Sequence, residues 1–318
     1  MSQVSRSILI TGGTSGLGFH AATTIAKRRP DTFIVIASRK DPDKAADAIN
    51  TKLGQRNVQF MPLDLGNIKS VRSFVNAWAE KKLAPISVLL LNAGLQFPGE
   101  VSYTTDGLES TFGINHVGHA LLFHLIQPYM AEEARIVVTS SGTHDPAQKS
   151  GLPDAKYDTA EELAHPTPAT LKNDGRQRYS TSKLCNVLWT YALDRRLSRV
   201  NKKWTVVAFD PGLMPGTGLA RDYGFFLRFV WNKVLPALLP LLRRLLTPNV
   251  HTPEESGGNL AWVALDDSDT SGKYYEGRKQ IPSSTDSYDQ KKQEDLWEWT
   301  VNYLSSGQQQ KQNFEALT

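Results

Sequence analysis

Tyr179 and Lys183 are four residues apart, a spacing that places two side chains on one face of an α-helix. A lysine ammonium near a phenol stabilises the phenolate and so lowers the pKa of the tyrosine. A tyrosine tuned in this way can give or take a proton near neutral pH. Tyr-x-x-x-Lys pairs are common on helix surfaces, so this pair gains weight only from the other motifs of the chain.

A glycine-rich turn, Thr11–Gly18, follows the first apolar segment of the chain. Glycines in such a turn let the backbone approach a pyrophosphate, whose charge is stabilised at the N-terminus of the next helix. A plain strand–helix connection could have the same composition. The position directly after a predicted strand favours a nucleotide site.

The end of the second apolar segment indicates which dinucleotide is bound. It reads Ser38-Arg39-Lys40, without the acid that usually binds the ribose 2′-hydroxyl of NAD. Arg39 offers a guanidinium that can hold a 2′-phosphate through two hydrogen bonds. We therefore expect NADP(H), the alternative being that Arg39 and Lys40 are ordinary solvated loop charges.

Six short apolar segments without alternation predict strands that are buried on both faces of a parallel sheet. These strands are Ser7–Ile10, Phe33–Ala37, Val58–Met61, Ser87–Leu91, Arg135–Thr139 and Thr205–Phe209. Segments of helical period alternate with them, at His20–Arg28, Pro42–Leu53, Ile68–Lys81, Leu108–Met130 and Thr181–Val200. This alternation predicts an α/β chain forming a single doubly wound (Rossmann) domain over residues 1–318, with helices on both faces of a central parallel sheet.

Two stretches interrupt the alternation. Residues 142–177 are polar and contain four prolines, which predicts a long loop with one short helix. The second stretch, residues 213–252, is rich in apolar side chains. Between 224 and 248 it has fifteen apolar residues, four positive charges and no acid. It therefore suits either the lining of a large apolar pocket or contact with an anionic membrane surface.

Local signals predict where two helices begin and where the ordered part of the chain ends. Asn67 and Thr252 precede helical patterns and are expected to cap them, with Pro253 at the first helical position of the second. The glutamine-rich tail beyond Ser305 is expected to fray.

Composition excludes several classes of protein. With 318 residues, 40% hydrophobic and 21% charged, the chain is an ordinary globular one rather than disordered or fibrous. The longest apolar run, Leu260–Leu265, is too short to cross a membrane, and Met1–Ser7 lacks the pattern of a signal peptide. A net charge of +4 does not indicate a nucleic-acid partner.

No metal site or disulfide is expected. Cys185 is the single cysteine, which favours a reducing cytoplasm. His116, His119 and His124 give one pair at i, i+3 and have no carboxylate in reach by sequence.

In combination, these motifs resemble those of the short-chain dehydrogenase/reductase family over about residues 7–265. Besides the glycine turn and the Tyr–Lys pair, the matching motifs occur in family order: Asp64-Leu65, Asn92-Ala93-Gly94, Asn115, Ser141 and Pro211-Gly212.

The resemblance implies a catalytic tetrad of Asn115, Ser141, Tyr179 and Lys183. Tyr179 would exchange a proton with the substrate oxygen, which Ser141, favoured over Ser140 by the family pattern, would orient. Lys183 would hold the nicotinamide ribose and lower the pKa of the tyrosine, and Asn115 would hold the water of a proton relay.

The resemblance also implies the residues of a cofactor site. Asp64 and Leu65 would flank the adenine, and Asn92-Ala93-Gly94 would brace the sheet. The complete set expected around NADP(H) is Thr11, Gly12, Thr14, Ser15, Gly16, Leu17, Gly18, Ser38, Arg39, Lys40, Asp64, Leu65, Asn92, Ala93, Gly94, Tyr179, Lys183, Pro211, Gly212 and Thr217.

The long insertion between Ser141 and Tyr179 resembles a particular branch of the family. With the Cys185-Asn186 pair and the segment after Pro211-Gly212, it is similar to light-dependent protochlorophyllide reductases and membrane-associated retinol dehydrogenases. The family resemblance also implies that residues 213–252, which follow Pro211-Gly212, form an apolar lid over the substrate. Cys185 is better explained as a small buried thiol than as a reactive group.

These observations favour an NADPH-dependent oxidoreductase that transfers a hydride between the nicotinamide and a carbonyl or alcohol of a bulky hydrophobic substrate. The alternatives are a carbon–carbon double-bond reductase and a non-catalytic dinucleotide-sensing protein. The expected partners are the lipophilic substrate, a membrane surface in contact with residues 224–248, and a second copy in a homodimer. The expected location is the cytoplasm, or its face of a membrane.

Overall fold

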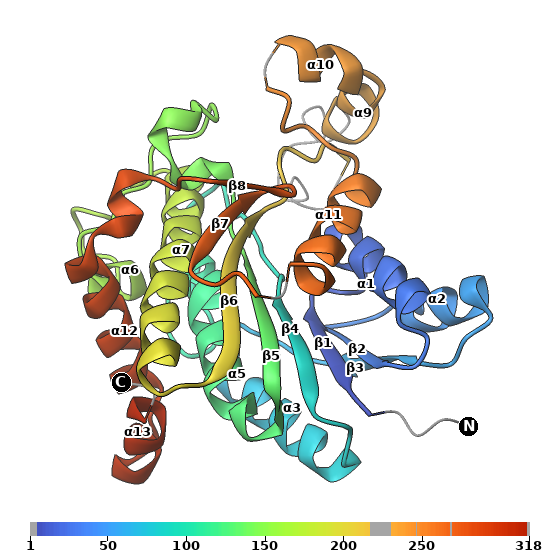
Figure 1. Ribbon diagram of the computed structural model, residues 1–318. Coiled ribbons are helices and arrows are strands. Elements are labelled where there is room, and N and C mark those ends of the chain that lie inside the picture. The colour runs from blue at the N-terminus through green and yellow to red at the C-terminus, as the bar shows by residue number, and fades with distance from the viewer. Residues whose placement is uncertain (1–4, 217–229, 246, 268, 317–318) are drawn as a thin grey trace.

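One sheet of eight strands organises the chain in a computed structural model that describes residues 5–216, 230–245, 247–267 and 269–316 (Figure 1). The strand order is β3-β2-β1-β4-β5-β6-β7-β8, with all neighbours parallel except β7 and β8. The strands are β1 (Ser7–Thr11), β2 (Phe33–Ser38), β3 (Val58–Pro62), β4 (Ile86–Leu91), β5 (Met130–Thr139), β6 (Lys203–Asp210), β7 (Lys273–Glu276) and β8 (Lys279–Ile281). The six predicted strands are confirmed, whereas β7 and β8 are too short and too polar for the sequence to predict.

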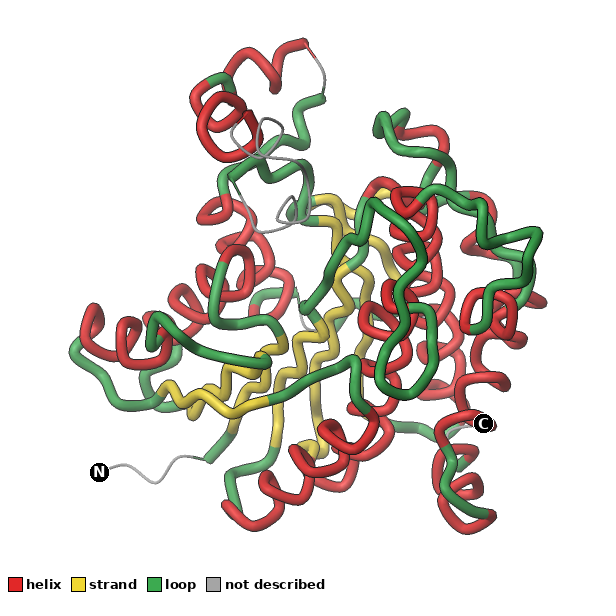
Figure 2. The backbone as a smooth tube through the Cα atoms, turned by 180° about the vertical axis from the view of Figure 1, so that it is seen from behind, coloured by secondary structure: helices red, strands yellow, loops and turns green. Residues whose placement is uncertain are grey.

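Helices cover both faces of the sheet, as Figures 1 and 2 show from opposite sides. One face carries α1 (Gly16–Arg28), α2 (Ala45–Leu53) and α11 (Pro253–Leu265). The other carries α3 (Ile68–Lys81), α5 (Gly118–Ile126), α7 (Gly175–Arg199) and α12 (Gln290–Leu304). The predicted doubly wound architecture is confirmed.

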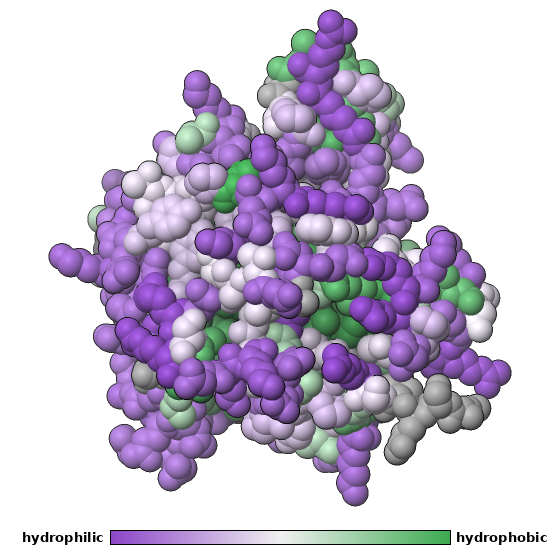
Figure 3. All heavy atoms as spheres, viewed as in Figure 1, coloured by the Kyte–Doolittle hydropathy of each residue, from purple (hydrophilic) through white to green (hydrophobic). Residues whose placement is uncertain are grey.

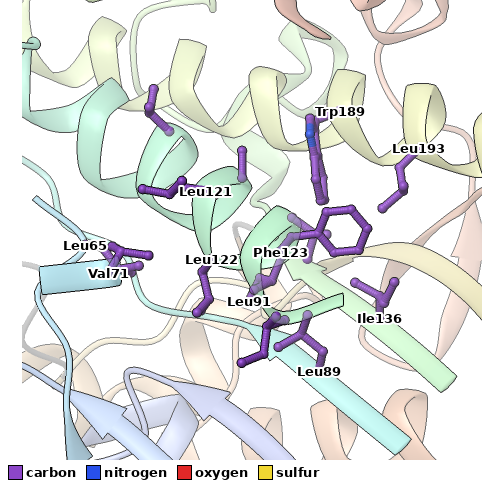
Figure 4. Packing of buried hydrophobic residues seen from close by; sticks show 14 of the residues in the cluster. Leu65, Val71, Leu89, Leu91, Leu121, Leu122, Phe123, Ile136, Trp189 and Leu193 are labelled. Atoms are coloured by element: carbon purple, nitrogen blue, oxygen red, sulfur yellow. The ribbon is translucent and has the colours of Figure 1, made fainter. Parts of the chain in front are cut away.

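Two apolar cores lie between the sheet and these helical layers, because successive strand residues point to opposite faces. In the larger core, Leu89 and Leu91 of β4 lie beneath Phe123 of α5 and Trp189 of α7 (Figure 4). The rings of Phe123 and Trp189 meet edge to face, with centroids 5.2 Å apart. Each such fully buried side chain contributes about 2–3 kcal/mol by its removal from water.

The strand order reverses direction at β1, which pairs with β2 on one side and with β4 on the other. A sheet of this kind opens a crevice at the carboxyl ends of the strands at the reversal point, where ligands bind. The glycine turn follows β1, and Asn92-Ala93-Gly94 follows β4. The fold therefore brings two of the sequence motifs to this crevice.

The predicted continuous helix over Leu108–Met130 is wrong. This segment is divided into α4 (Ser110–Phe112), the π-helical turn η1 (Gly113–Val117), α5 and the 3₁₀ turn η2 (Gln127–Tyr129), and its last residue already belongs to β5. Gly118, at the start of α5, packs directly against the backbone carbonyl of Leu65. This close approach between two chain segments is not visible in local periodicity.

The polar insertion contains the 3₁₀ turns η3 (Gly142–His144) and η4 (Pro146–Gln148) and the short helix α6 (Ala160–Ala164). The prediction of a loop with one short α-helix is thus confirmed. The following helix α7 begins at Gly175 rather than at Thr181, because Asp174 caps it by accepting a hydrogen bond from the Arg176 backbone.

Both predicted helix caps are confirmed. The Asn67 side chain accepts the backbone N–H of Ser70 at 3.0 Å. Thr252 forms a reciprocal capping box with Glu255, and Pro253 occupies the first turn.

The glutamine-rich tail is not frayed. It forms α13 (Gln308–Glu315), from which Phe314 stacks on His124 of α5 at a centroid distance of 4.5 Å. Phe314 is buried, so a tertiary contact orders a segment whose own composition is polar.

The described part of the lid projects beyond the carboxyl end of β6 as η6 (Val230–Val234), α9 (Leu235–Ala237) and α10 (Leu239–Leu245) (Figure 1). Its base is closed by backbone hydrogen bonds of Leu213 with Asn249 and His251. Figure 3 shows hydrophobic and hydrophilic side chains side by side on this projection. Within the described residues, no helix is long and apolar enough to cross a membrane.

Candidate active site

The glycine turn after β1 is shaped by backbone contacts. Gly12 has a φ of +70°, which favours glycine, and a side chain there would come within 2.9 Å of the Ala93 Cα atom. Gly18, in the first turn of α1, packs on the carbonyl of Gly12 and leaves no room for a Cβ. The Ser15 side chain makes no capping hydrogen bond, and the first turn of α1 contains no acid. This helix start therefore presents backbone N–H groups that suit an anion.

Thr11 and Asn92 lie beneath the turn and join β1 to β4. The Thr11 hydroxyl accepts the backbone N–H groups of Asn92 and Ala93 at 2.8 and 3.0 Å. The Asn92 amide donates to the Thr11 carbonyl at 2.9 Å, and its oxygen accepts from Thr139 of β5. The Thr11 side chain is wholly buried and shapes the turn from below, so its expected part in the cofactor site stays a prediction.

Ser38, Arg39 and Lys40 end β2 beside this turn, with Arg39 and Lys40 exposed. Among the described residues, no carboxylate pairs with Arg39. The nearby acid Asp41 accepts the backbone N–H of Ala45 at the start of α2. The Arg39 guanidinium is therefore available to an anionic ligand.

Asp64 and Leu65 follow β3 with different environments. The Asp64 carboxylate accepts the backbone N–H of Gly66 at 2.9 Å, which fixes the loop and leaves its second oxygen for other partners. The side chain of Leu65 points into the core near Val71 (Figure 4). The side chain of Leu65 thus belongs to the core, and the expectation that this residue flanks the adenine stays a prediction.

Tyr179 and Lys183 lie one turn apart on α7, and both are buried. The Lys183 ammonium is 5.6 Å from the centre of the Tyr179 ring and donates to the carbonyl of Thr139 at 3.2 Å. Burial lowers the pKa of Lys183 to about 8, although the carboxylate of Asp210 acts in the opposite direction. The amine thus remains mainly charged at pH 7 and loses its proton in mildly alkaline solution.

Asn115 lies in the π-helical turn η1 and is wholly buried. Its amide donates to the Leu95 carbonyl at 2.9 Å and to the Ser182 hydroxyl at 3.0 Å, and its oxygen accepts from the Leu95 backbone. A Cβ on Gly94 would lie 3.2 Å from the Lys183 amine and 3.6 Å from the Asn115 oxygen. Gly94 therefore marks the point where the elements carrying Asn115 and Lys183 meet.

The structure distinguishes the two serines that follow β5. Ser140 is buried, and its hydroxyl donates to the Lys183 carbonyl at 2.8 Å. Ser141 is half-buried, and its hydroxyl accepts the backbone N–H of Thr143 at 3.3 Å, which leaves its proton for another acceptor. The bond from Ser140 draws the end of β5 onto the turn of α7 that carries Lys183, and this arrangement favours Ser141 as the serine open to a substrate.

Pro211 and Gly212 follow β6 at the base of the lid. The buried carboxylate of Asp210 accepts the Gly212 N–H and the Asn249 amide, each at 2.9 Å. It thereby ties the two ends of the lid to the sheet. Thr217, also expected at the cofactor, lies outside the described residues.

Asp210, Thr139 and Asn186 belong to the surroundings of the site, although the sequence did not single out their roles. The Thr139 carbonyl receives both the Lys183 amine and the Asn186 amide. An acid directly before Pro-Gly, and an asparagine three residues after Lys183, are the signals that could have identified two of them.

Cys185 and the three histidines that follow Asn115 are buried in the packed interior. Cys185 is wholly buried in the larger core, which confirms its interpretation as a structural thiol. Burial lowers the pKa of His116, His119 and His124 to about 3, 4 and 3, so each is neutral at pH 7. Within the described residues, no cluster of three or more His, Cys, Asp or Glu is placed to hold a metal ion.

This doubly wound sheet, with its glycine turn and its buried Tyr–Lys pair, defines the class of dinucleotide-dependent oxidoreductases. The family model for short chain dehydrogenases matches residues 6–151. Protochlorophyllide reductase from Pisum sativum is 31% identical, over 92% of this chain and 76% of that protein. The polyprenol dehydrogenase of Homo sapiens is 30% identical, over 92% and 83% respectively.

Solved structures share the fold. A crystal structure of an uncharacterized protein from Mycobacterium paratuberculosis superposes with a TM-score of 0.68 at 24% identity, covering 95% of this chain and 94% of that one. A variant of actinorhodin polyketide ketoreductase with NADPH gives a TM-score of 0.59 at 20% identity, covering 86% of this chain and 96% of that one. The chain belongs to the short-chain dehydrogenase/reductase family, and it is related to the branch that contains protochlorophyllide reductase.

Proposed function

We propose that this protein is an NADPH-dependent oxidoreductase that interconverts a carbonyl and an alcohol on a bulky lipophilic substrate. The observation that carries the proposal is the buried Lys183 ammonium, 5.6 Å from the ring of Tyr179 and packed against Gly94 beside Asn115. Burying a cation costs several kcal/mol unless it is compensated, so a non-catalytic dinucleotide sensor would gain nothing from keeping it there.

The residues around the crevice fit a dinucleotide. Gly12 and Gly18 let the turn pack closely on the Asn92-Ala93 segment and on itself, and the start of α1 offers backbone N–H groups to a pyrophosphate. Arg39, exposed and without a carboxylate partner among the described residues, would hold a 2′-phosphate. Asp41, two residues further along the chain, accepts the backbone N–H of Ala45 at the start of α2.

When bound, the nicotinamide supplies or accepts a hydride. The chain would then handle the proton and the developing charge on the substrate oxygen. Tyr179 would donate its phenolic proton to this oxygen, and Ser141 would orient the oxygen by a hydrogen bond. Lys183 would favour the phenolate that remains, and the buried Asn115 would keep the Gly94 segment and α7 in register.

The exposed side chains of the lid are compatible with a lipophilic substrate and with a membrane contact. Leu238, Leu241 and Leu245 are 41%, 50% and 69% exposed in the described part of the lid. Leucines that face solvent, next to the exposed Arg244, are available to a bulky apolar ligand or to an anionic lipid surface. Part of the apolar lid sequence, including Phe226, lies outside the described residues.

Reduction of a carbon–carbon double bond is the second candidate, because protochlorophyllide reductase is among the relatives. The Tyr–Lys pair serves either reaction, since the proton acceptor would be a carbon in one case and an oxygen in the other. Turnover of NADPH with a panel of ketones, aldehydes and enones distinguishes the two reactions.

Location and assembly stay predictions. Relatives named as chloroplastic occur alongside the human polyprenol dehydrogenase, so similarity does not favour the expected cytoplasmic location. A homodimer and the absence of a nucleic-acid partner likewise follow from the sequence alone.

The catalytic assignment is tested by Tyr179→Phe. We expect this substitution to abolish turnover while leaving NADPH affinity nearly unchanged, because the phenol acts mainly in the transition state. Lys183→Ala should impair both turnover and cofactor binding. If Tyr179→Phe retains more than a few per cent of the rate, another group supplies the proton.

A further inference from the structure

His144 is a buried histidine that the proposed mechanism does not use. It is 1% exposed and ends the 3₁₀ turn η3, three residues after Ser141. Its Nδ1 atom lies 2.7 Å from the carbonyl oxygen of Ser141, and its Nε2 atom lies 3.1 Å from the backbone nitrogen of Ser284.

These two contacts define the tautomer of the ring. The Ser284 backbone N–H can only donate, so Nε2 must carry the free lone pair. The proton is therefore on Nδ1, which donates to the Ser141 carbonyl. Burial lowers the pKa of His144, against the opposing effects of the Ser141 carbonyl, Asp210 and Asp145, so the ring is neutral at pH 7.

The loop that receives Nε2 is itself fixed to α7. The Ser287 hydroxyl donates to the Ser284 carbonyl and is hydrogen-bonded to Ser283, which in turn bonds the hydroxyl of Tyr191, all at 2.6 Å. Tyr191 lies on α7, two turns beyond Lys183. The ring of His144 also packs on Tyr274 of β7, with centroids 4.8 Å apart.

We propose that His144 is a positioning residue, which holds Ser141 at a fixed place relative to Tyr179 by joining the Ser141 carbonyl to the Ser284 loop on α7. This inference rests on the proposed function of Ser141. Its physical basis is that hydride and proton transfer need near-ideal geometry, and a displacement of about 1 Å can cost on the order of 100-fold in rate.

Three substitutions separate the two ring contacts. Asparagine places its amide near the position of Nδ1 and can keep the donor to Ser141, whereas glutamine reaches the position of Nε2 and can keep only the contact with Ser284. Phenylalanine fills the volume and removes both contacts. We expect kcat to fall at least about tenfold in His144→Phe and His144→Gln, and to recover most of this loss in His144→Asn. The Kd for NADPH should change less than about twofold in all three, because the cofactor is held by other elements.

His124→Phe is the matched control, since His124 is equally buried but packs on Phe314, away from Ser141. Its kcat should equal that of the unmodified protein. If His144→Phe fails to fold, the comparison of Asn with Gln decides: a kcat in His144→Gln equal to or above that in His144→Asn overturns the proposal. Unchanged kcat in all three variants also overturns it.

A measurement without substrate distinguishes failure of this inference from failure of the proposed function. In protein labelled with ¹⁵N-histidine, the His144 signal is identified by its loss in His144→Phe. We expect a protonated Nδ1 and an unprotonated Nε2. A proton on Nε2 would contradict the hydrogen bond to Ser141 whether or not a carbonyl substrate is turned over.

Discussion

At the scale of single residues, the site combines buried charge with narrow steric clearance. Lys183 and Asp210 are both nearly inaccessible, and a Cβ at Gly12, Gly13 or Gly18 of the turn would collide with neighbouring protein atoms. Buried ionisable groups change pKa more than exposed ones, so their protonation states give direct tests.

Arg39 is expected to set the cofactor preference. In Arg39→Ala, the ratio of NADPH to NADH affinity should fall by roughly 30-fold, because a bidentate guanidinium–phosphate contact contributes about 2 kcal/mol. Titration of both cofactors by fluorescence measures this ratio. Arg199→Ala, an exposed arginine at the far end of α7, should leave it unchanged. Equal affinities for NADPH and NADH in the unmodified protein would contradict the assignment.

Lys183 should make NADPH binding dependent on pH. Its pKa, lowered to about 8, means that the ammonium present at pH 7 is largely lost by pH 9. If Lys183 holds the nicotinamide ribose as proposed, the charged amine would be the stronger donor to its hydroxyls, so the Kd for NADPH should rise by up to about tenfold over this range. In Lys183→Met, the Kd should be weaker and nearly independent of pH across this range. A flat profile in the unmodified protein would show that Lys183 keeps its proton or does not contact the cofactor.

At the scale of elements, the carboxyl ends of β1, β4, β5 and β6 each supply part of the site, and α7 joins them. The Ser140 and Lys183 hydrogen bonds connect the end of β5 to α7, and Asp210 connects the end of β6 to the lid. The tail helix α13 contributes to packing rather than to the site, because its Phe314 stacks on His124 of α5.

The exposed leucines of the lid can be tested for contact with a membrane surface. If its exposed leucines contact lipid, the protein should sediment with anionic vesicles, and salt should reverse the binding, because screening weakens the attraction of Arg244 and Lys233. Leu241→Ser together with Leu245→Ser should reduce sedimentation severalfold. Leu171→Ser, which changes an exposed leucine of the insertion, should have no effect.

A pocket role of the lid gives a different result. Leu238→Ser should then raise KM for a bulky substrate more than for a small ketone, with or without vesicles. Preference for small polar carbonyls, together with no binding to vesicles, would exclude both roles.

At the scale of the whole molecule, neutral buried histidines make the fold sensitive to acid. His116, His119 and His124 have folded-state pKa values of about 3, 4 and 3, whereas an unfolded histidine titrates near 6.5. Between these limits the unfolded state binds more protons than the folded state, so the free energy of unfolding falls as the pH drops below 6.5. At pH 5 each of these histidines should reduce this free energy by about 2 kcal/mol relative to pH 7.

Urea unfolding of the unmodified protein and of His124→Phe at pH 7 and pH 5 measures this effect. The variant should lose about 2 kcal/mol less between the two pH values, because one of the three histidines no longer titrates on unfolding. An identical loss in both proteins would mean that His124 takes up its proton in the folded state.

The sequence by itself determined six of the eight strands of the sheet and the positions of its motifs. The six strands are buried on both faces, so their continuous apolar segments are recognisable without any partner, and the caps at Asn67 and Thr252 depend on residues within one turn. The glycine turn and the Tyr179–Lys183 pair are local patterns for the same reason.

Tertiary structure alone decided which of these residues face the crevice and which support it. Thr11 points inward because it binds the backbone after β4, and Leu65 points inward because it packs in the core. Ser140, unlike Ser141, donates a hydrogen bond to a helix that begins more than thirty residues later. The π-helical turn at Asn115, the order of α13 and the tautomer of His144 likewise depend on distant partners, Ser284 in the last case. Such contacts join residues far apart in the chain, and no local periodicity or propensity encodes them.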